Sequence, residues 1–159
     1  LAAVLLHIVL LFQSPTPSHY KMAENFQGKW KVDLSSTTGL DDFGAAIGFS
    51  AERIETYRKL SYVIDYSAAG DTHTVTVAFD AEVPSQTYSF KLGETFDYNS
   101  IDGTKPKLTI TMEGGKMVES YSLEDKNKEW KTVREVDGAV MTSTTTFDGK
   151  SVSQKLNKQ

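Results

Sequence analysis

The 159-residue sequence contains no cysteine and no Asn-x-Ser/Thr acceptor site. Without cysteine the chain forms no disulfide bond, has no thiolate nucleophile and offers no thiolate ligand to zinc. The missing acceptor site likewise excludes N-glycosylation. These absences fit a protein of a reducing compartment.

Histidine is scarce, and the motifs of common enzyme classes are missing. His7 and His19 lie in the first 21 residues, which leaves His73 for the rest of the chain. No HExxH, GxSxG, GxGxxG or GxxxxGK(S/T) pattern occurs. The acidic pairs at 41–42 and 124–125 are expected on a short helix and in a turn, as solvated surface groups. The sequence therefore predicts a protein that is not an enzyme and has no metal site or cofactor.

Basic residues are fewer than acidic residues, 17 against 21. The formal net charge is −4 and the isoelectric point is about 5.4. Binding to a phosphate backbone needs a net basic surface that releases counterions, so nucleic acid is excluded as a general partner. The length is that of one ordinary globular domain with a sizeable core.

The only long apolar run is LAAVLLHIVLLF at residues 1–12, which is too short to span a bilayer. It resembles the apolar region of a secretory signal, but it has no initiating methionine and no basic segment before it. We favour a second interpretation, in which residues 1–21 are a disordered leader or upstream sequence translated ahead of Met22. A cytoplasmic domain over residues 22–159 is therefore expected, and a secreted protein is the alternative.

From Ser61 onward the sequence repeats stretches of period-two alternation, as expected for antiparallel strands joined by hairpins. Three such stretches are THTVTVAF, QTYSFKL and KLTITM. In THTVTVAF we expect His73 to be exposed or locally hydrogen-bonded. Turns that tolerate positive φ are predicted at 69–71, 114–115, 125–127, 137–138 and 148–149.

One region has helical spacing instead. Leu40, Phe43 and Ile47 form one apolar stripe, Ile54 and Tyr57 form a second, and a glycine separates the two segments. A serine at position 50 can cap the second helix. One strand, a helix pair and about nine further strands predict an all-β protein, a closed barrel with a helix-turn-helix lid.

The stretch MTSTTTF is hydroxylic on both faces. It suits a wall between bulk water and a hydrated cavity, although the β-propensity of threonine explains it equally well.

In KEWKTVREV, Trp130, Thr132, Arg134 and Val136 share one face. If Trp130 points inward, so does Arg134, and a dry, unpaired guanidinium would be strongly unfavourable. Either Arg134 binds the carboxylate of a ligand, with Gln154 as a neutral neighbour, or it reaches solvent or pairs internally with an Asp or Glu. The alternation leaves these interpretations open.

Several landmarks occur in a familiar order: FxGxW at 26–30, LDDF at 40–43, SFKLGETF at 89–96, MEGGK at 112–116 and VRE at 133–135. With these motifs, the chain from residue 22 to 159 resembles the intracellular fatty-acid-binding protein family, the cytosolic relatives of lipocalins. The helix pair after the first strand, the missing cysteines and the missing C-terminal helix separate it from lipocalins themselves.

The resemblance implies a ten-stranded, up-and-down antiparallel β-barrel, or clam, around a water-filled cavity that ligand enters past the helices. By position, Arg134 matches the internal arginine that several members use for the ligand carboxylate. Leu40 and Phe43 match residues that line the cavity near its entrance, and Val83 falls in the turn that faces the lid. Asp102 matches an internal acidic position.

The chain also departs from the family pattern. Fatty-acid binders commonly carry Arg-x-Tyr near the C-terminus, where this chain has Gln154, Lys155 and Leu156. Thr104 stands where many members have the arginine partner of the acidic position. Glutamine at 154 is similar to members that bind retinol, but those also have glutamine in place of Arg134. The second helix and MEGGK are similar to the liver and bile-acid branches, so the subfamily stays open.

The resemblance implies a monomeric carrier that binds long-chain fatty acids or similar amphipathic lipids, with a bile-acid or retinoid carrier as the alternative. With one arginine instead of two, we expect weaker discrimination of acids over alcohols. Arg53, Arg58 and Lys59 could touch anionic membranes during ligand transfer, or be a solvated face. The predicted ligand-binding residues are Arg134, Gln154, Leu156, Leu40, Phe43, Val83, Asp102, Thr132 and Trp130.

Overall fold

The computed structural model describes residues 24–80 and 82–159, so the predicted leader, residues 1–21, lies outside the described residues. Ten strands form one sheet in the order β4-β3-β2-β1-β10-β9-β8-β7-β6-β5. The strands are β1 (Gly28–Thr38), β2 (Tyr62–Ala69), β3 (Thr72–Phe79), β4 (Gln86–Phe90), β5 (Thr95–Asp97), β6 (Lys107–Glu113), β7 (Lys116–Leu123), β8 (Lys128–Asp137), β9 (Val140–Phe147) and β10 (Lys150–Lys158). The helices are η2 (Glu24–Phe26), α1 (Leu40–Ile47), α2 (Ala51–Lys59) and η3 (Glu124–Lys126).

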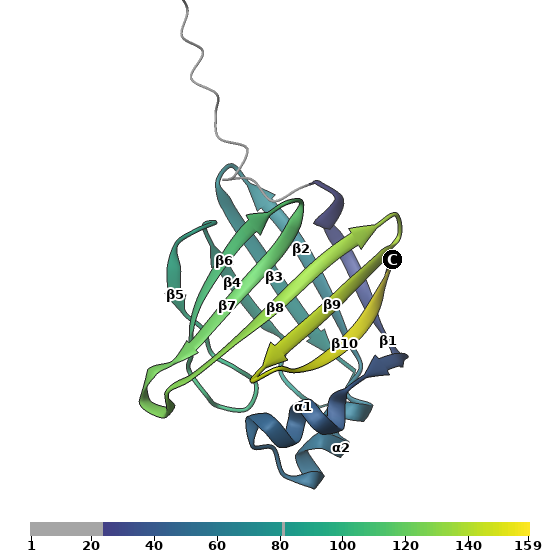
Figure 1. Ribbon diagram of the computed structural model, residues 1–159. Coiled ribbons are helices and arrows are strands. Elements are labelled where there is room, and N and C mark those ends of the chain that lie inside the picture. The colour runs from purple at the N-terminus through teal and green to yellow at the C-terminus, as the bar shows by residue number, and fades with distance from the viewer. Residues whose placement is uncertain (1–23, 81) are drawn as a thin grey trace, which may run out of the picture.

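The sheet closes on itself because the first strand pairs with the last. β1 is antiparallel to both β2 and β10, and the other paired strands are sequence neighbours in antiparallel register. The predicted up-and-down barrel of ten strands is thus confirmed (Figure 1). The predicted turns are confirmed as well, since Gly70, Gly115, Asn127, Gly138 and Asp148 all have positive φ.

The ladder is interrupted at one seam, where β4 and β5 are not hydrogen-bonded to each other. Aromatic rings close this seam. Tyr88 of β4 lies 6.0 Å from Phe96 of β5 and 5.2 Å from Tyr98, measured between ring centroids. Phe90 stacks on Phe96 at 6.0 Å. Side-chain packing therefore continues the barrel wall where backbone pairing stops.

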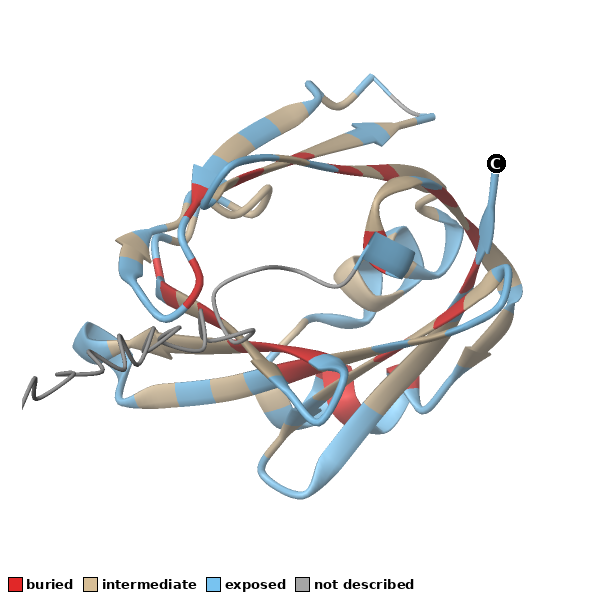
Figure 2. Cartoon of the chain, turned by 90° about the horizontal axis from the view of Figure 1, so that it is seen from above, coloured by how far each residue is buried: buried red, intermediate tan, exposed pale blue. Residues whose placement is uncertain are grey.

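On β2, β3, β6 and β9 buried residues recur at alternate positions, as expected where every second side chain faces the barrel interior. Figure 2 shows the buried positions distributed around the barrel wall. At the end opposite the helices the interior is filled. Phe26 of η2 and Trp30 of β1 are fully buried there, and the indole Nε1 of Trp30 donates to the carbonyl oxygen of Phe26 at 2.8 Å. The FxGxW motif thus builds a plug, and its glycine, Gly28, has a φ of 99°.

His73 belongs to this filled end, and the expectation of an exposed or locally bonded imidazole is wrong. The side chain is fully buried, its ring stacks on Phe90 at 5.3 Å, and neither ring nitrogen has a hydrogen-bond partner among the described residues. His73 is buried because of its position in β3. His73 shares the inward face of β3 with Val75, and the barrel closes over that face.

The helix pair follows the predicted boundaries. Ser50 caps α2, its hydroxyl oxygen accepting from the backbone N–H of Arg53 at 3.2 Å. Gly48 ends α1 with a φ of 92°, a conformation that glycine adopts without strain. Gly44 lets the helices meet closely, because a Cβ there would overlap the side chain of Ile54. The pair covers one end of the barrel (Figure 1).

Candidate functional site

The barrel encloses a cavity of about 420 Å³ on the lid side of the filled end. Its apolar and aromatic lining comes from both helices and from strands on opposite walls. The lining includes Leu40, Phe43, Ile47, Phe49, Tyr57, Leu60, Tyr62, Ile64, Tyr66, Val75, Val77, Phe79, Tyr88, Tyr98, Tyr121, Leu123, Trp130 and Val152. A volume of this size lies within the ~300–1,000 Å³ of small-molecule sites.

The structure brings most of the predicted ligand-binding residues to this one cavity. Seven of them line it: Leu40, Phe43, Asp102, Trp130, Thr132, Arg134 and Gln154. Two do not. Leu156 is fully buried in the core of the barrel, in register with Val32 and Met141, and Val83 is half-buried in the loop before β4. Both lie outside the cavity lining.

Arg134 faces the interior, and an acidic side chain already occupies one of its two carboxylate-binding edges, the one formed by Nε and Nη2. Its Nε donates to Oε1 of Glu119 at 2.8 Å, and Nη2 donates to Oε2 of Glu119 at 3.3 Å. Nη1 donates to the hydroxyl of Ser143 at 3.0 Å. Of the interpretations left open by the sequence, the internal ion pair is therefore the arrangement present.

The pair is buried, and its electrostatics follow from that. The side chain of Glu119 is 1% exposed and that of Arg134 is 13% exposed. Desolvation alone would lower the pKa of Arg134, but the adjacent Glu119 carboxylate outweighs it and holds that pKa well above its usual range. Tyr121 adds a third member, its hydroxyl donating to Oε2 of Glu119 at 2.8 Å. Burial first, and then this carboxylate, raise the pKa of Tyr121.

Sequence reasoning missed Glu119, although a signal was present. In KMVESYSL the alternation places Glu119 on the same face as Met117 and Tyr121, a buried methionine and a cavity-lining tyrosine. A carboxylate between two such residues points inward with them. Charged residues are seldom buried without a partner. When one strand carries an acidic residue on its apolar face and the next strand carries a basic residue on its apolar face, the sequence therefore predicts an ion pair inside the protein.

Gln154 belongs to a separate polar group. Its Oε1 accepts from the Tyr62 hydroxyl at 2.8 Å, and its Nε2 donates to the hydroxyl of Thr37 at 3.1 Å. These bonds tie β10 to β1 and β2 near the lid. The amide therefore lines the same cavity as Arg134, but its hydrogen bonds go to other partners.

The hydroxylic strand β9 lies between the cavity and the outer surface, and a hydrated cavity on its inner face stays a prediction. Facing inward, Thr145 lines the cavity and shares a hydrogen bond of 2.8 Å with Thr132. Facing outward, Thr144 and Thr146 bond serines of β10 at 3.1 and 2.7 Å. Hydroxyl pairs therefore occur on both faces of β9.

At the mouth of the cavity an ion pair joins the lid to the loop between β5 and β6. Arg53 of α2 donates through Nη2 to Oδ2 of Asp102, and both residues line the cavity. Thr104 holds the carboxylate in place, donating its N–H at 2.9 Å and its hydroxyl at 2.5 Å to Oδ1. The guanidinium of Arg53 also lies 4.5 Å from the ring centroid of Phe49. Arg53 thus supplies the cation partner that Thr104 cannot.

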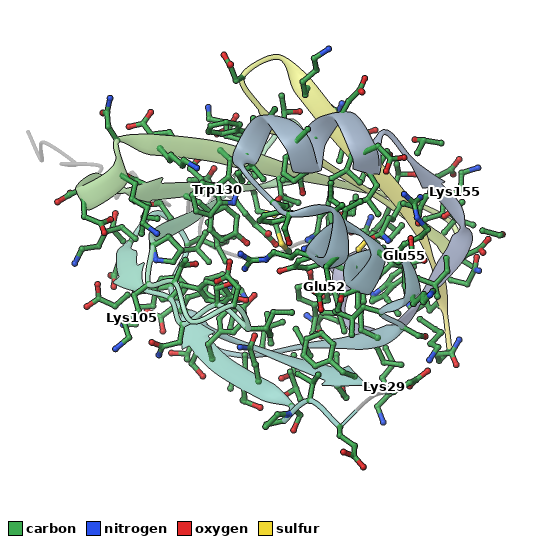
Figure 3. All side chains as sticks on the ribbon, turned by 90° about the horizontal axis from the view of Figure 1, so that it is seen from below. Lys29, Glu52, Glu55, Lys105, Trp130 and Lys155 are labelled. Atoms are coloured by element: carbon green, nitrogen blue, oxygen red, sulfur yellow. The ribbon has the colours of Figure 1, made fainter. Side chains whose placement is uncertain are left out.

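The helices lie across the mouth of the barrel, with Glu52 and Glu55 on the second helix (Figure 3). The other lid cations are paired there. Arg58 contacts Asp41 of α1 at 2.6 Å and Glu55 at 3.1 Å, and Lys59 contacts Glu55 at 3.0 Å. These pairs are solvent-exposed, so each contributes little to stability.

Within residues 24–80 and 82–159, no set of three or more metal-ligating side chains is close enough to hold an ion. None of the helices in the same residues is both long and apolar enough to cross a membrane.

Known proteins resemble this chain along most of its length. Intestinal fatty acid-binding protein of Homo sapiens is 27% identical over 133 residues, covering 84% of this chain and 98% of that protein. A Schistosoma mansoni fatty acid binding protein, solved in complex with arachidonic acid, superposes with a TM-score of 0.78 at 21% identity, covering 87% of this chain and 99% of that one.

Secretory abundant heat soluble protein 4 from Ramazzottius varieornatus also reaches a TM-score of 0.78, at 20% identity over 87% of this chain and 98% of that one. At these identities the two structures establish the shared fold. A family model matches residues 24–157, which is nearly the whole described barrel, and the chain therefore belongs to the lipocalin / cytosolic fatty-acid binding protein family.

Proposed function

We propose that the protein binds long-chain fatty acids or similar amphipathic lipids in its barrel cavity and transports them without chemical change. The observation that supports this proposal is the cavity of about 420 Å³ inside the barrel, with a lining in which apolar and aromatic side chains predominate, and with the two helices across its mouth (Figure 3). The human relative is named an intestinal fatty acid-binding protein, and the Schistosoma mansoni relative was solved with arachidonic acid.

Most of the affinity would come from the lipid tail. Burial of each methylene is worth ~0.8 kcal/mol, so a sixteen-carbon chain contributes on the order of 10 kcal/mol before the losses of association and ordering. The polar groups at Arg134 and Gln154 then select among head groups.

The test is displacement of a fluorescent fatty acid from the delipidated full chain by oleate, retinol and a bile acid. We expect displacement with one lipid bound per chain at low micromolar concentration or tighter, that is, about −8 kcal/mol or more. Failure of all three to displace the probe, or of the probe to bind, would contradict the proposal. Preferential displacement by retinol or the bile acid would favour the alternative retinoid or bile-acid carrier.

The proposal includes a monomer in the cytoplasm, and the word "cytosolic" in the description of the matching family supports the location. Light scattering of the purified chain tests the monomer. The secreted alternative rests on the apolar run at residues 1–12, which resembles the apolar region of a secretory signal. Localisation of a tagged full chain in its native cells distinguishes the two.

Contact of the lid with anionic membranes stays a prediction. Arg53, Arg58 and Lys59 each pair with a carboxylate, so these pairs would have to open before the cations could meet lipid head groups. Lipid transfer to anionic vesicles that is faster than transfer to neutral vesicles, and slowed by salt, would support the contact.

A further inference from the structure

We propose that Glu119 sets the head-group preference of the cavity, by neutralising Arg134 so that long-chain lipids with an uncharged polar head are favoured over fatty-acid carboxylates. The favoured heads are alcohols, amides and esters. The inference rests on the proposed function as a lipid carrier, and it narrows that function to a ligand class.

The first argument is geometric. A carboxylate binds an arginine best along an edge where two parallel N–H groups meet both oxygens. In Arg134 the edge formed by Nε and Nη2 is already held by the two oxygens of Glu119, at 2.8 and 3.3 Å. Glu119 is 1% exposed and does not line the cavity, so a ligand in the cavity does not compete directly for its oxygens.

The second argument is charge. Arg134 and Glu119 together carry no net charge, and they are buried in a place of low dielectric. A ligand carboxylate entering beside them would be a third charge without a counterion, and it would repel Glu119 across the guanidinium. An uncharged oxygen brings no such charge and needs only a hydrogen-bond donor.

The third argument is the supply of donors. Three of the five N–H groups of Arg134 are used by Glu119 and Ser143, which leaves two for a ligand oxygen. The phenol side chains of Tyr66 and Tyr88 also line the cavity. Burial raises the pKa of both tyrosines, so they keep their protons and can donate.

The experiment compares oleic acid with oleyl alcohol, which share one tail and differ in the head group. Both are titrated by fluorescent-probe displacement at neutral pH against the delipidated full chain and against Glu119→Gln. The ratio of the two dissociation constants cancels the contribution of the tail. Glu135→Gln is the matched control, because Glu135 forms an exposed pair with Lys116 on the outer face of the same strand as Arg134.

We expect the parent protein to bind oleyl alcohol at least as tightly as oleate. In Glu119→Gln the uncompensated Arg134 should favour the acid, shifting the ratio toward oleate by about 10-fold or more. Glu135→Gln should leave the ratio unchanged. A parent protein that prefers oleate by about 10-fold, or a ratio unmoved by Glu119→Gln, would overturn the inference.

A double variant, Glu119→Gln with Arg134→Gln, decides the matter if the single variant does not fold. It removes both charges together, so the affinities for oleate and oleyl alcohol should change in the same proportion. If Arg134 instead anchors a carboxylate, the double variant loses oleate binding selectively by about 10-fold. If the parent binds neither lipid, the proposed function fails as well. If the parent binds both lipids but the ratio of the two dissociation constants does not change as predicted when Glu119 and Arg134 are neutralised, this inference alone fails.

Discussion

The ion pair between Arg53 and Asp102 should act as a latch that slows lipid release. It joins α2 to the loop between β5 and β6, across the mouth of the cavity. Asp102→Asn keeps the size of the side chain and one oxygen for Thr104, but it removes the charge that holds Arg53. We therefore expect the substitution to open the mouth more often without unfolding the barrel.

The exposure of the two side chains sets the magnitude. Asp102 is 14% exposed and Arg53 is 35% exposed, which places the pair between a surface pair worth ~0–1 kcal/mol and a buried pair worth ~3–5 kcal/mol. A value of ~1–2 kcal/mol corresponds to a shift of about 5–30-fold in the opening equilibrium. Release of a lipid that requires opening should accelerate by the same factor.

The assay is stopped-flow transfer of a fluorescent fatty acid from the protein to neutral vesicles. Lys107→Gln is the control, because Lys107 forms an ion pair with Asp97 at 2.7 Å beside the same loop, with both side chains more than half exposed. Only Asp102→Asn should accelerate release. Equal release rates in the parent and Asp102→Asn would refute the latch, as would equal acceleration by both variants.

The latch should be insensitive to pH across the neutral range. Partial burial alone would raise the pKa of Asp102, but hydrogen bonds from Thr104 and Ser100 and the charge of Arg53 lower it below its ordinary value of 3.8. A carboxyl with a lowered folded-state pKa contributes its stability above the ordinary value and loses it as the pH falls through the folded value. Release should therefore be constant from about pH 5 to about pH 8 and accelerate only in stronger acid.

Two predictions concern stability. Arg134→Gln should destabilise the barrel by ~3–5 kcal/mol, because it leaves Glu119 buried without its counterion. The double variant with Glu119→Gln should lose less in urea unfolding, and an equal or greater loss would contradict the ion-pair argument. His73→Phe should raise the free energy of unfolding by ~1 kcal/mol or more, since it removes two buried nitrogens without partners. Thermal or urea unfolding measures this, and a less stable variant would show that the imidazole has a stabilising contact.

The sequence alone determined the order and kind of the elements. Period-two alternation, regular turn residues and one region of helical spacing are local signals, and each follows from the direction in which successive Cβ atoms point. They gave the strands, the helix pair and the cap at Ser50. Alternation also placed Arg134 on the inward face, together with Trp130 and Thr132.

Tertiary structure decided what each inward group meets. Glu119 and Arg134 lie on neighbouring strands, fifteen positions apart, and only the register of β7 with β8 brings them into contact. Arg53 and Asp102 are 49 positions apart and meet because the lid folds over the mouth. His73 is buried because the barrel closes at that end. Local alternation predicts which side chains point inward. The partner of each inward side chain depends on the strand register and on the closure of the barrel, which are set by contacts between segments distant in sequence.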